Sequence, residues 1–419
     1  LRSGPSSWTA RSSARFDPGG RLSARGGLIY RHRSIPTRLP EGRYHASGPT
    51  LGVELSGRWS DRSGGARVEG GYEAMTERTA ILRETYLHAG SELGRYVWED
   101  ANGDGLTQVD EFLPEPTPME GSYVRRFFPS DELVPVIRGA THLNLRLDGS
   151  RLVGEEPGWL GTVASELESE TRVEVSEEST TDRLRTVYLM QLDRFQHPAR
   201  TVDGRIRWSE RLEVFPDRAR GGLLVRMQHA RSMHRRSTGI RQDLNRIVTV
   251  RPRVRLAEAW TGRVTARWSR DRSASPRFAS RSFDIRSRML APELEVGAGT
   301  YWTARLRLGW TRKRDPGGGG ERRTARIWRL PLHLEYDRPA GWRLQGRLEP
   351  AWVRASGPTS GLAGYELTDG RGPGRSLRWH LRARYALSDE LDATLRYDGR
   401  LPAEAPAVHT VGLELRATF

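Results

Sequence analysis

The chain has 419 residues, a formal net charge of +16 at pH 7, 36% hydrophobic residues and no cysteine. The lack of cysteine excludes disulfides, a thiol nucleophile and cysteine-based metal sites. No run approaches the ~18 apolar residues of a membrane helix, so the sequence excludes helical membrane spans. It does not exclude a membrane β-barrel, whose strands need only about ten residues of alternating polarity. The chain starts at Leu1 with neither an initiator methionine nor a signal peptide, and we expect it to be part of a longer protein.

The first 90 residues predict a group of strands. In "LGVELSGRW", from Leu51, apolar residues occupy every second position and polar residues lie between them. A period of two indicates a strand with two distinct faces, whereas a helix would show a period near 3.6. Turn signals separate such segments, as in "DPGG" from Asp17 and "DRSGG" from Asp61. Residues 1–90 are therefore predicted to be N-terminal barrel strands.

One acidic segment interrupts the alternation, "EDANGDGLTQVDEF", from Glu99 to Phe112. Its spacing suits a twelve-residue loop in which alternate side chains turn toward one cation, a glycine permits the sharp bend, and the last carboxylate binds through both oxygens. The predicted Ca²⁺ ligands, in loop order, are Asp100, Asn102, Asp104, the backbone carbonyl of Leu106, Gln108 and Glu111. The alternative is an acidic turn that fits the pattern by chance.

This loop resembles the calcium loops of EF-hand and dockerin proteins. It departs from them at its eighth position, where Thr107 replaces the usual apolar residue. Its flanks also depart, because "GRYVW" before it indicates a strand and "LPEPTP" after it cannot be helical. We therefore expect an isolated structural Ca²⁺ loop in an extracellular insertion, residues 91–138, rather than a helix–loop–helix sensor. Within this insertion, "FFPSDELVPV" from Phe127 is expected to be an extended linker.

Residues 139–419 predict a long run of C-terminal barrel strands. Period-two alternation recurs in "THLNLRLD", "VTVRPRVRL", "GRVTARW", "WTARLRLGW", "WRLPLHLEY" and "LRWHLRARYAL". Roughly fifteen to eighteen strands are expected in the whole chain. The Gly- and Pro-rich stretch from Gly357 to Gly374 is expected to be a long loop, and no segment has convincing helical periodicity.

The positive charge is almost entirely arginine, since Lys313 is the only lysine. The arginines alternate with apolar residues inside the strands, which directs them to the face opposite the apolar one. In a barrel they would point into the lumen, because an arginine facing lipid near the midplane costs about 2–4 kcal/mol. Two interpretations follow: cross-strand ion pairs, or a positive lumen that favours anionic solutes. The expected partners are Glu335, Glu349, Asp398 and Glu414.

The chain ends in "VGLELRATF". This segment resembles the terminal strand of Gram-negative outer-membrane β-barrel proteins, which end in an aromatic residue preceded by alternating apolar positions. The matching residues are Val411, Leu413, Leu415 and Phe419, whereas Ala417 stands where an aromatic residue is more usual. The resemblance implies recognition of this strand by the barrel-assembly machinery. The chain also resembles the C-terminal barrel part of large surface barrels that carry an acidic, glycine-containing insertion.

A soluble β-sandwich or β-solenoid would also show alternation. Two features favour the membrane barrel. The strands run for about ten to thirteen residues, longer than the five or six usual in sandwiches. Aromatic residues also gather near strand ends, as they do in interfacial girdles. These residues are Trp59, Trp268, Trp302, Trp310, Trp328, Tyr336, Trp342, Tyr385 and Tyr397. The predicted fold is an all-β, antiparallel, up-and-down transmembrane β-barrel.

The sequence shows no catalytic motif, and its ten histidines are scattered. His229 and His234 have no carboxylate at a useful spacing, and His380 is expected to line the lumen. Nucleic-acid binding is not expected, because acidic residues are interspersed with the arginines and no binding module is present. We expect a non-enzymatic barrel in the bacterial outer membrane that passes solutes or polymers or has a structural role. The alternative is a soluble, secreted, calcium-binding interaction protein.

Overall fold

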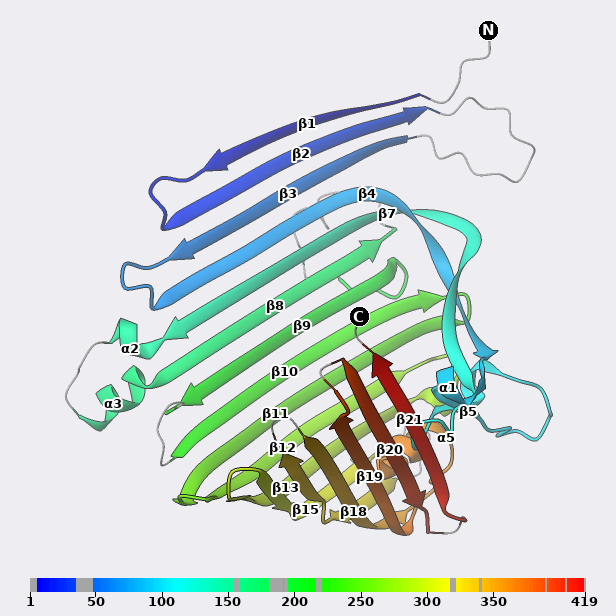
Figure 1. Cartoon of the computed structure of the whole chain (residues 1–419). Coiled ribbons are helices and arrows are strands. Elements are labelled where there is room, and N and C mark those ends of the chain that lie inside the picture. The colour runs from blue at the N-terminus through cyan, green and yellow to red at the C-terminus, as the bar shows by residue number, and fades with distance from the viewer. Residues whose placement is uncertain are drawn as a thin grey trace. The chain divides into compact units, whose positions relative to one another are not determined.

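The computed structural model describes residues 6–34, 48–153, 158–180, 191, 195–215, 221–316, 322–338, 341–388, 390–403 and 405–417. Within these residues, 21 strands belong to one large sheet, and all but one of its pairings with a given register are antiparallel (Figure 1). The predicted all-β, antiparallel fold class is confirmed. No helix among the described residues is long and apolar enough to cross a membrane.

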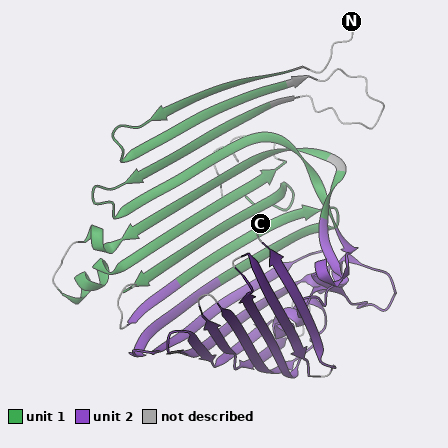
Figure 2. Cartoon of the chain, in the orientation of Figure 1, with its two compact units in different colours: residues 1–84, 127–216, 226–246 green, residues 85–126, 217–225, 247–419 purple. Residues whose placement is uncertain are grey.

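The chain divides into two compact units (Figure 2). The first comprises residues 1–84, 127–216 and 226–246, and the second comprises residues 85–126, 217–225 and 247–419. The predicted division at residues 90 and 138 remains a prediction. One detail differs from expectation, because the supposed linker after Phe127 lies inside a strand that starts at Tyr123.

The first unit is built from long strands that pair with their neighbours in chain order, β1–β2–β3–β4–β7–β8–β9–β10. Three of them, β4, β7 and β10, include residues of the second unit, as does the next strand, β11. The elements are β1 Ser6–Phe16, β2 Leu22–Ser34, β3 Gly48–Ser60, β4 Ala66–His88, β7 Tyr123–Asp148, α2 Gly149–Leu152, α3 Trp159–Ser165, β8 Leu167–Ser179, β9 Thr201–Val214, β10 Gly221–Arg236 and β11 Gly239–Ala257.

The second unit contains the predicted insertion and a second run of paired strands. Its elements are α1 Gly90–Leu93, β5 Tyr96–Trp98, η1 Val109–Glu111, β6 Phe112–Pro114, β12 Trp260–Ala274, η3 Ala279–Arg281, β13 Phe283–Ala298, β14 Trp302–Arg307, β15 Gly309–Asp315, β16 Arg323–Arg329, β17 Leu332–Asp337, β18 Trp342–Ser356, α5 Gly361–Thr368, β19 Gly374–Ala386, β20 Leu391–Leu401 and β21 Val408–Ala417.

The strand count exceeds the expected fifteen to eighteen because two rows of the sheet are each broken in two. β14 and β15 both pair with β13, and β16 and β17 both pair with β18. A proline lies opposite each break. The backbone N–H of Leu308, between β14 and β15, donates to the carbonyl of Pro292, and the backbone N–H of Leu330, between β16 and β17, donates to the carbonyl of Pro350. Since proline has no N–H to donate, the ladder cannot continue unbroken through these positions. With the three-residue strands β5 and β6 also set aside, the full-length rows fall within the predicted range.

The two faces of the strands differ as the alternation predicts. Large apolar side chains remain exposed along one face of strand after strand. Examples are Trp8, Leu28, Leu55, Leu143, Val254, Leu256, Trp268, Leu290, Trp302, Leu306, Trp328, Leu334, Trp342, Leu348 and Leu381. Polar and charged side chains occupy the alternate positions. In β18, exposed Trp342 and Leu348 alternate with Arg343, Arg347 and the buried Glu349.

A helix that the sequence did not predict covers part of the second unit. Helix α5 lies within the stretch expected to be a long loop. Its Leu367 is fully buried in a cluster with Ile285, Ala325, Ile327 and Val353 from β13, β16 and β18. Two turns are too short to give a readable helical period, so burial of Leu367, rather than local propensity, holds this segment helical.

The turn between β3 and β4 follows its sequence signal. The carboxylate of Asp61 accepts hydrogen bonds from the hydroxyl and backbone N–H of Ser63 and from the backbone N–H of Ala66. These bonds, led by the Ser63 hydroxyl, lower the pKa of Asp61 to about 2. At neutral pH the ionised carboxylate of Asp61 therefore accepts the hydrogen bonds of this turn.

Substitution of Gly399 tests the packing of the apolar face. A Cβ at Gly399 in β20 would lie 2.2 Å from the indole of Trp379 on the paired strand β19, whereas a Cβ at Gly412 in β21 would meet nothing within 4 Å. We expect Gly399→Ala to lower the free energy of unfolding by about 1–3 kcal/mol through overpacking, and Gly412→Ala to change it little. Urea unfolding of the refolded protein measures both. The loss should shrink when Trp379 is also replaced by alanine; an equal loss in both backgrounds would contradict this packing.

Candidate functional site

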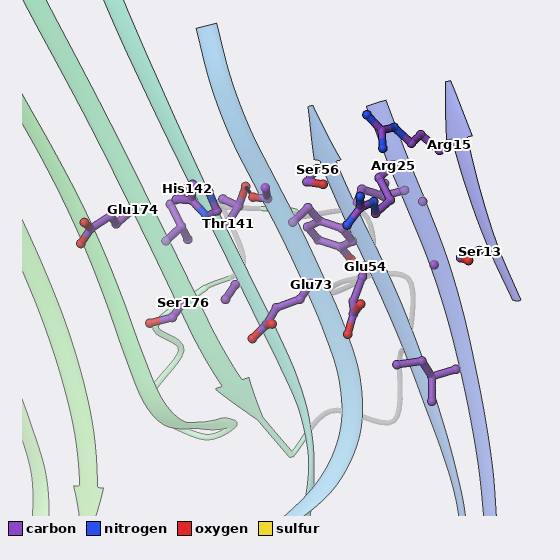
Figure 3. A pocket seen from close by; sticks show the side chains of 18 of the residues that line it. Ser13, Arg15, Arg25, Glu54, Ser56, Glu73, Thr141, His142, Glu174 and Ser176 are labelled. Carbon is purple, nitrogen blue, oxygen red and sulfur yellow. Dashed lines mark hydrogen bonds between the residues drawn. The ribbon is translucent and has the colours of Figure 1, made fainter. Parts of the chain in front are cut away.

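The polar face of the first unit is hollowed into a cavity of about 980 Å³ (Figure 3). Seven strands line it, from β1 to β4 and from β7 to β9. The register brings its side chains into rows, since Arg15 opposes Arg25 and Arg25 opposes Ser56. The polar lining residues labelled in Figure 3 are Ser13, Arg15, Arg25, Glu54, Ser56, Glu73, Thr141, His142, Glu174 and Ser176.

Charges in this cavity are only partly matched. Glu54 and Glu73 are direct cross-strand partners, and Figure 3 shows their carboxylates side by side and pointing the same way. Like charges placed opposite each other are unfavourable unless water or an ion screens them. The imidazole of His142 lies directly over Gly71, where an added Cβ would be 2.4 Å from the ring. The lining of this cavity is therefore mixed, with charged and hydroxyl side chains beside Ile29, Leu55 and Val175.

In the second unit, arginines and glutamates form a ladder across adjacent strands. Arg263 of β12 contacts Glu293 and Glu295 of β13, at 3.0 and 2.6 Å. Glu293 also accepts from Arg307 of β14, and Glu295 lies 2.9 Å from Arg305. The ladder then extends from Arg305 to Glu335 of β17, at 3.3 Å. The side chain of Glu293 is only 8% exposed, so its paired arginines offset the cost of burying its charge.

The four carboxylates expected to pair with inward arginines are all paired, though not always with an arginine of the next strand. Glu335 pairs with Arg305, and Glu414 lies 3.9 Å from Arg396 on the adjacent strand. Asp398 pairs instead with His380, at 2.6 Å. Glu349 pairs with Arg347 on its own strand and with Arg371 in the loop after α5. Burial lowers the pKa of Arg371 to about 10, which leaves it protonated at neutral pH.

His234 has no carboxylate at a useful spacing in the sequence, but the fold supplies one. Its Nδ1 lies 2.7 Å from Asp203 on the neighbouring strand β9, and Arg236 lies 3.6 Å from the same carboxylate. Spacing along the sequence could not show this, because 31 residues separate His234 from Asp203 and only strand pairing joins them. Among the described residues, His229 forms no hydrogen bond or ion pair with a carboxylate; its Nδ1 accepts from Arg246 at 3.0 Å.

The acidic loop brings together three of its predicted ligands. One oxygen each from Asp100, Asp104 and Glu111 lies within 4.8 Å of the other two. Oxygen ligands of Ca²⁺ lie 2.3–2.6 Å from the ion, so oxygens this close can share one cation. Gly103 and Gly105 have φ near +70°, and their amides donate to Asp100. The donor set is therefore chemically suited to Ca²⁺.

The other predicted ligands hold the loop in shape. The amide of Asn102 donates to Asp104 at 2.9 Å, and the backbone N–H of Leu106 donates to Asp104 at 2.7 Å. The side chain of Gln108 also donates to Asp104. The backbone carbonyl of Leu106 is not among the described contacts. Among the described residues, β5 precedes the loop and β6 follows it, and the loop itself ends in the single 3-10 turn η1, which contains Glu111.

Glu111 is the most constrained of the acidic residues. It is only 4% exposed, and its Oε2 accepts from the indole N–H of Trp98 at 2.8 Å. Its Oε1 is buried and has no hydrogen-bond partner among the described residues. An unpaired buried carboxylate oxygen is costly, and a cation at the loop would remove that cost.

The segment that carries this loop is anchored to strands of its own unit. Arg281 donates to the hydroxyl of Tyr86 at 2.9 Å and to the carbonyl of Val109. Arg400 of β20 donates through two nitrogens to both carboxylate oxygens of Glu120. A paired arginine fork of this kind fixes both position and orientation.

No protein-family model matches the sequence, and no curated protein matches it. Solved structures give low similarity. The siderophore receptor PirA from Pseudomonas aeruginosa is 10% identical, with a TM-score of 0.37 over 96% of this chain and 74% of that chain. The copper transporter OprC is 12% identical, with a TM-score of 0.41 over 98% of this chain and 62% of that chain. A bacterial polysaccharide outer membrane secretin is 8% identical, with a TM-score of 0.28 over 99% of this chain and 91% of that chain. Similarity at this level assigns no substrate to the chain.

The arginine–glutamate ladder predicts unequal effects of two matched substitutions. Arg263→Met removes two contacts from a partly buried network, whereas Arg207→Met removes one contact of 3.5 Å from the exposed Glu174. We expect Arg263→Met to lower the free energy of unfolding by about 1–3 kcal/mol and Arg207→Met by about 0–1 kcal/mol. Urea titration of both variants in the same detergent makes the comparison. Equal losses would show that the ladder adds nothing beyond a surface ion pair.

Proposed function

We propose that the chain is a non-enzymatic β-barrel protein of the bacterial outer membrane that passes solutes or polymers or has a structural role at the surface. The observation that carries this proposal is the separation of the two strand faces. One face exposes leucine, valine and tryptophan on strand after strand, and the other carries paired arginines and carboxylates. A water-soluble sheet would cover the apolar face, whereas lipid can solvate it.

The polar face of the first unit supports passage, because it carries a cavity of about 980 Å³. In the second unit, charged side chains reach across several strands in pairs, beside the apolar cluster under α5. A face of this kind stays hydrated and can line an aqueous path.

The proposed partners are outer-membrane lipid and the barrel-assembly machinery. In the last strand, β21, Val411, Leu413 and Leu415 are 66%, 70% and 64% exposed, which suits a lipid-facing row. Phe419, the terminal aromatic residue of the predicted recognition strand, lies outside the described residues. No nucleic-acid partner is proposed, since many arginines are engaged with carboxylates within the sheet.

Fractionation of the native, full-length protein tests the proposed location. We expect it to remain with the outer membrane after carbonate and high-salt washing, and to migrate faster on gels before heating than after. Release by washing would favour the soluble, secreted alternative. The passage role has a separate readout, because a protein that stays in the membrane but gives no conductance in planar bilayers would have a structural role alone.

We also propose that the acidic loop holds one structural Ca²⁺ ion. The supporting observations are the three converging carboxylates and the unpaired Oε1 of the buried Glu111. Asp100, Asp104 and Glu111 would supply carboxylate ligands, and Asn102, Gln108 and the carbonyl of Leu106 would complete the set. The ion would neutralise the clustered negative charge and rigidify the loop.

Removal of calcium should destabilise the protein. Extracellular sites bind Ca²⁺ at about 0.1–1 mM, so 10 mM Ca²⁺ should stabilise the folded state by about 1.4–2.7 kcal/mol relative to EDTA. We expect Asp100→Ala combined with Asp104→Ala to abolish this difference, and Asp17→Ala, in an exposed turn without the loop's other ligands, to preserve it. Thermal melts with and without Ca²⁺ make the measurement.

Luminescence of Tb³⁺ measures ion binding at the acidic loop directly. Because Trp98 hydrogen-bonds Glu111, Tb³⁺ in the loop should show luminescence sensitised by that indole, and Trp98→Phe should remove most of the signal. Identical melting temperatures in Ca²⁺ and EDTA, together with no sensitised luminescence, would refute the calcium site.

A further inference from the structure

A second cavity, of about 350 Å³, lies on the polar face of the second unit. Strands β16, β18, β19 and β20 and the loop after α5 form its wall, and residues 116–118 border it. Its lining includes four arginines, Arg329, Arg347, Arg371 and Arg378. The sequence places these arginines 18, 24 and 7 residues apart, so only the fold brings them together.

The carboxylates around this cavity already have partners. Glu349 accepts from Arg347 and Arg371, one on each oxygen. Asp369 pairs with Lys313, at 2.6 Å, and with Arg329. Within the lining, three carboxylates, those of Glu349, Asp369 and Asp398, face the four arginines and His380. Positive charge is in excess even when the histidine is neutral.

The excess positive charge lies at Arg378. Arg378 of β19 donates to the carbonyl of Gly370 at 3.0 Å, and no carboxylate forms an ion pair with it among the described residues. Thr117, which also lines this cavity, is 7% exposed, and its hydroxyl has no hydrogen-bond partner in the described part of the chain. Buried polar groups without partners are uncommon in native proteins. Arg378 lies opposite Glu349 in the register of β18 and β19, but Arg347 and Arg371 occupy the two oxygens of that carboxylate. The cavity therefore offers a guanidinium without an ion pair and a hydroxyl without a hydrogen bond.

The wall of the cavity is rigidly held. The side chain of Arg371 is only 2% exposed and is fixed against Glu349. The bordering segment is fixed by the two-nitrogen contact of Arg400 with Glu120, three residues after Thr117. Binding groups held in place before a ligand arrives lose little entropy when it binds.

We propose that this cavity is a binding site for a small oxyanion, a carboxylate or a phosphate. Guanidinium groups recognise both through paired, charge-assisted hydrogen bonds. Arg378 is the main contact, Thr117 donates from the bordering segment, and Arg347 and Arg371 supply the surrounding positive field. The cavity is at the small end of the range for ligand sites, so it fits a compact anion and not a polymer. The site does not depend on whether the protein conducts.

Titration calorimetry of the refolded, detergent-solubilised full chain tests the site, with inorganic phosphate and succinate as separate probes. We expect at least one probe to bind with a dissociation constant of 1 mM or below. Arg378→Gln should weaken that binding at least tenfold, and Thr117→Val several-fold. Arg382→Gln is the matched control, because Arg382 lies on the same face of the same strand, four residues further on, and outside the cavity.

The outcomes separate the possibilities. Binding of phosphate alone or succinate alone identifies the anion class, and Arg378→Gln must weaken it while Arg382→Gln changes it less than twofold. Equal weakening by both substitutions would show general attraction to a positive face and overturn the site. Absence of binding by either probe would also overturn it. If Arg378→Gln fails to fold, Thr117→Val, which keeps the side-chain shape and all charges, decides the question against the same control.

Discussion

The structure depends on one constraint: successive side chains of a paired strand must point to opposite faces. A shift of one residue in register would exchange the faces of a whole strand. Here that would put arginines where leucine and tryptophan now lie, and would separate the rows that join Arg263, Glu293 and Arg307. The alternation therefore fixes which residues lie on the apolar face and which on the polar face, and the register fixes which charges meet each other.

The polar face shows how one residue type can serve several purposes. Arg263 and Arg305 stabilise the sheet by linking neighbouring strands through glutamates. Arg400 holds an inserted segment through Glu120. Arg378 has no carboxylate partner among the described residues and stands beside a cavity. Because guanidinium stays charged in all these settings, its role is set by the number of carboxylates within reach.

The segment of residues 85–126 and helix α5 make the second unit more than a plain sheet. Tyr365 of α5 donates toward the carbonyl of Glu115 in that segment, and Leu367 packs on the strands beneath. The acidic loop and the arginine-lined cavity both lie along this covered region. A loop-borne cation and a strand-borne anion site would thus be supported by the same packing, although each is tested separately.

The sequence by itself determined the strands, their two faces, the turn at Asp61 and the spacing of the acidic loop. These features depend on local rules, namely side-chain alternation, turn chemistry and ligand spacing, which act over a few residues. Only the tertiary structure decided that Asp203 pairs with His234, that α5 is helical, and that Arg329 and Arg378 share a cavity. Those outcomes depend on contacts between residues tens to hundreds of positions apart, and a one-dimensional pattern does not state which strands are neighbours.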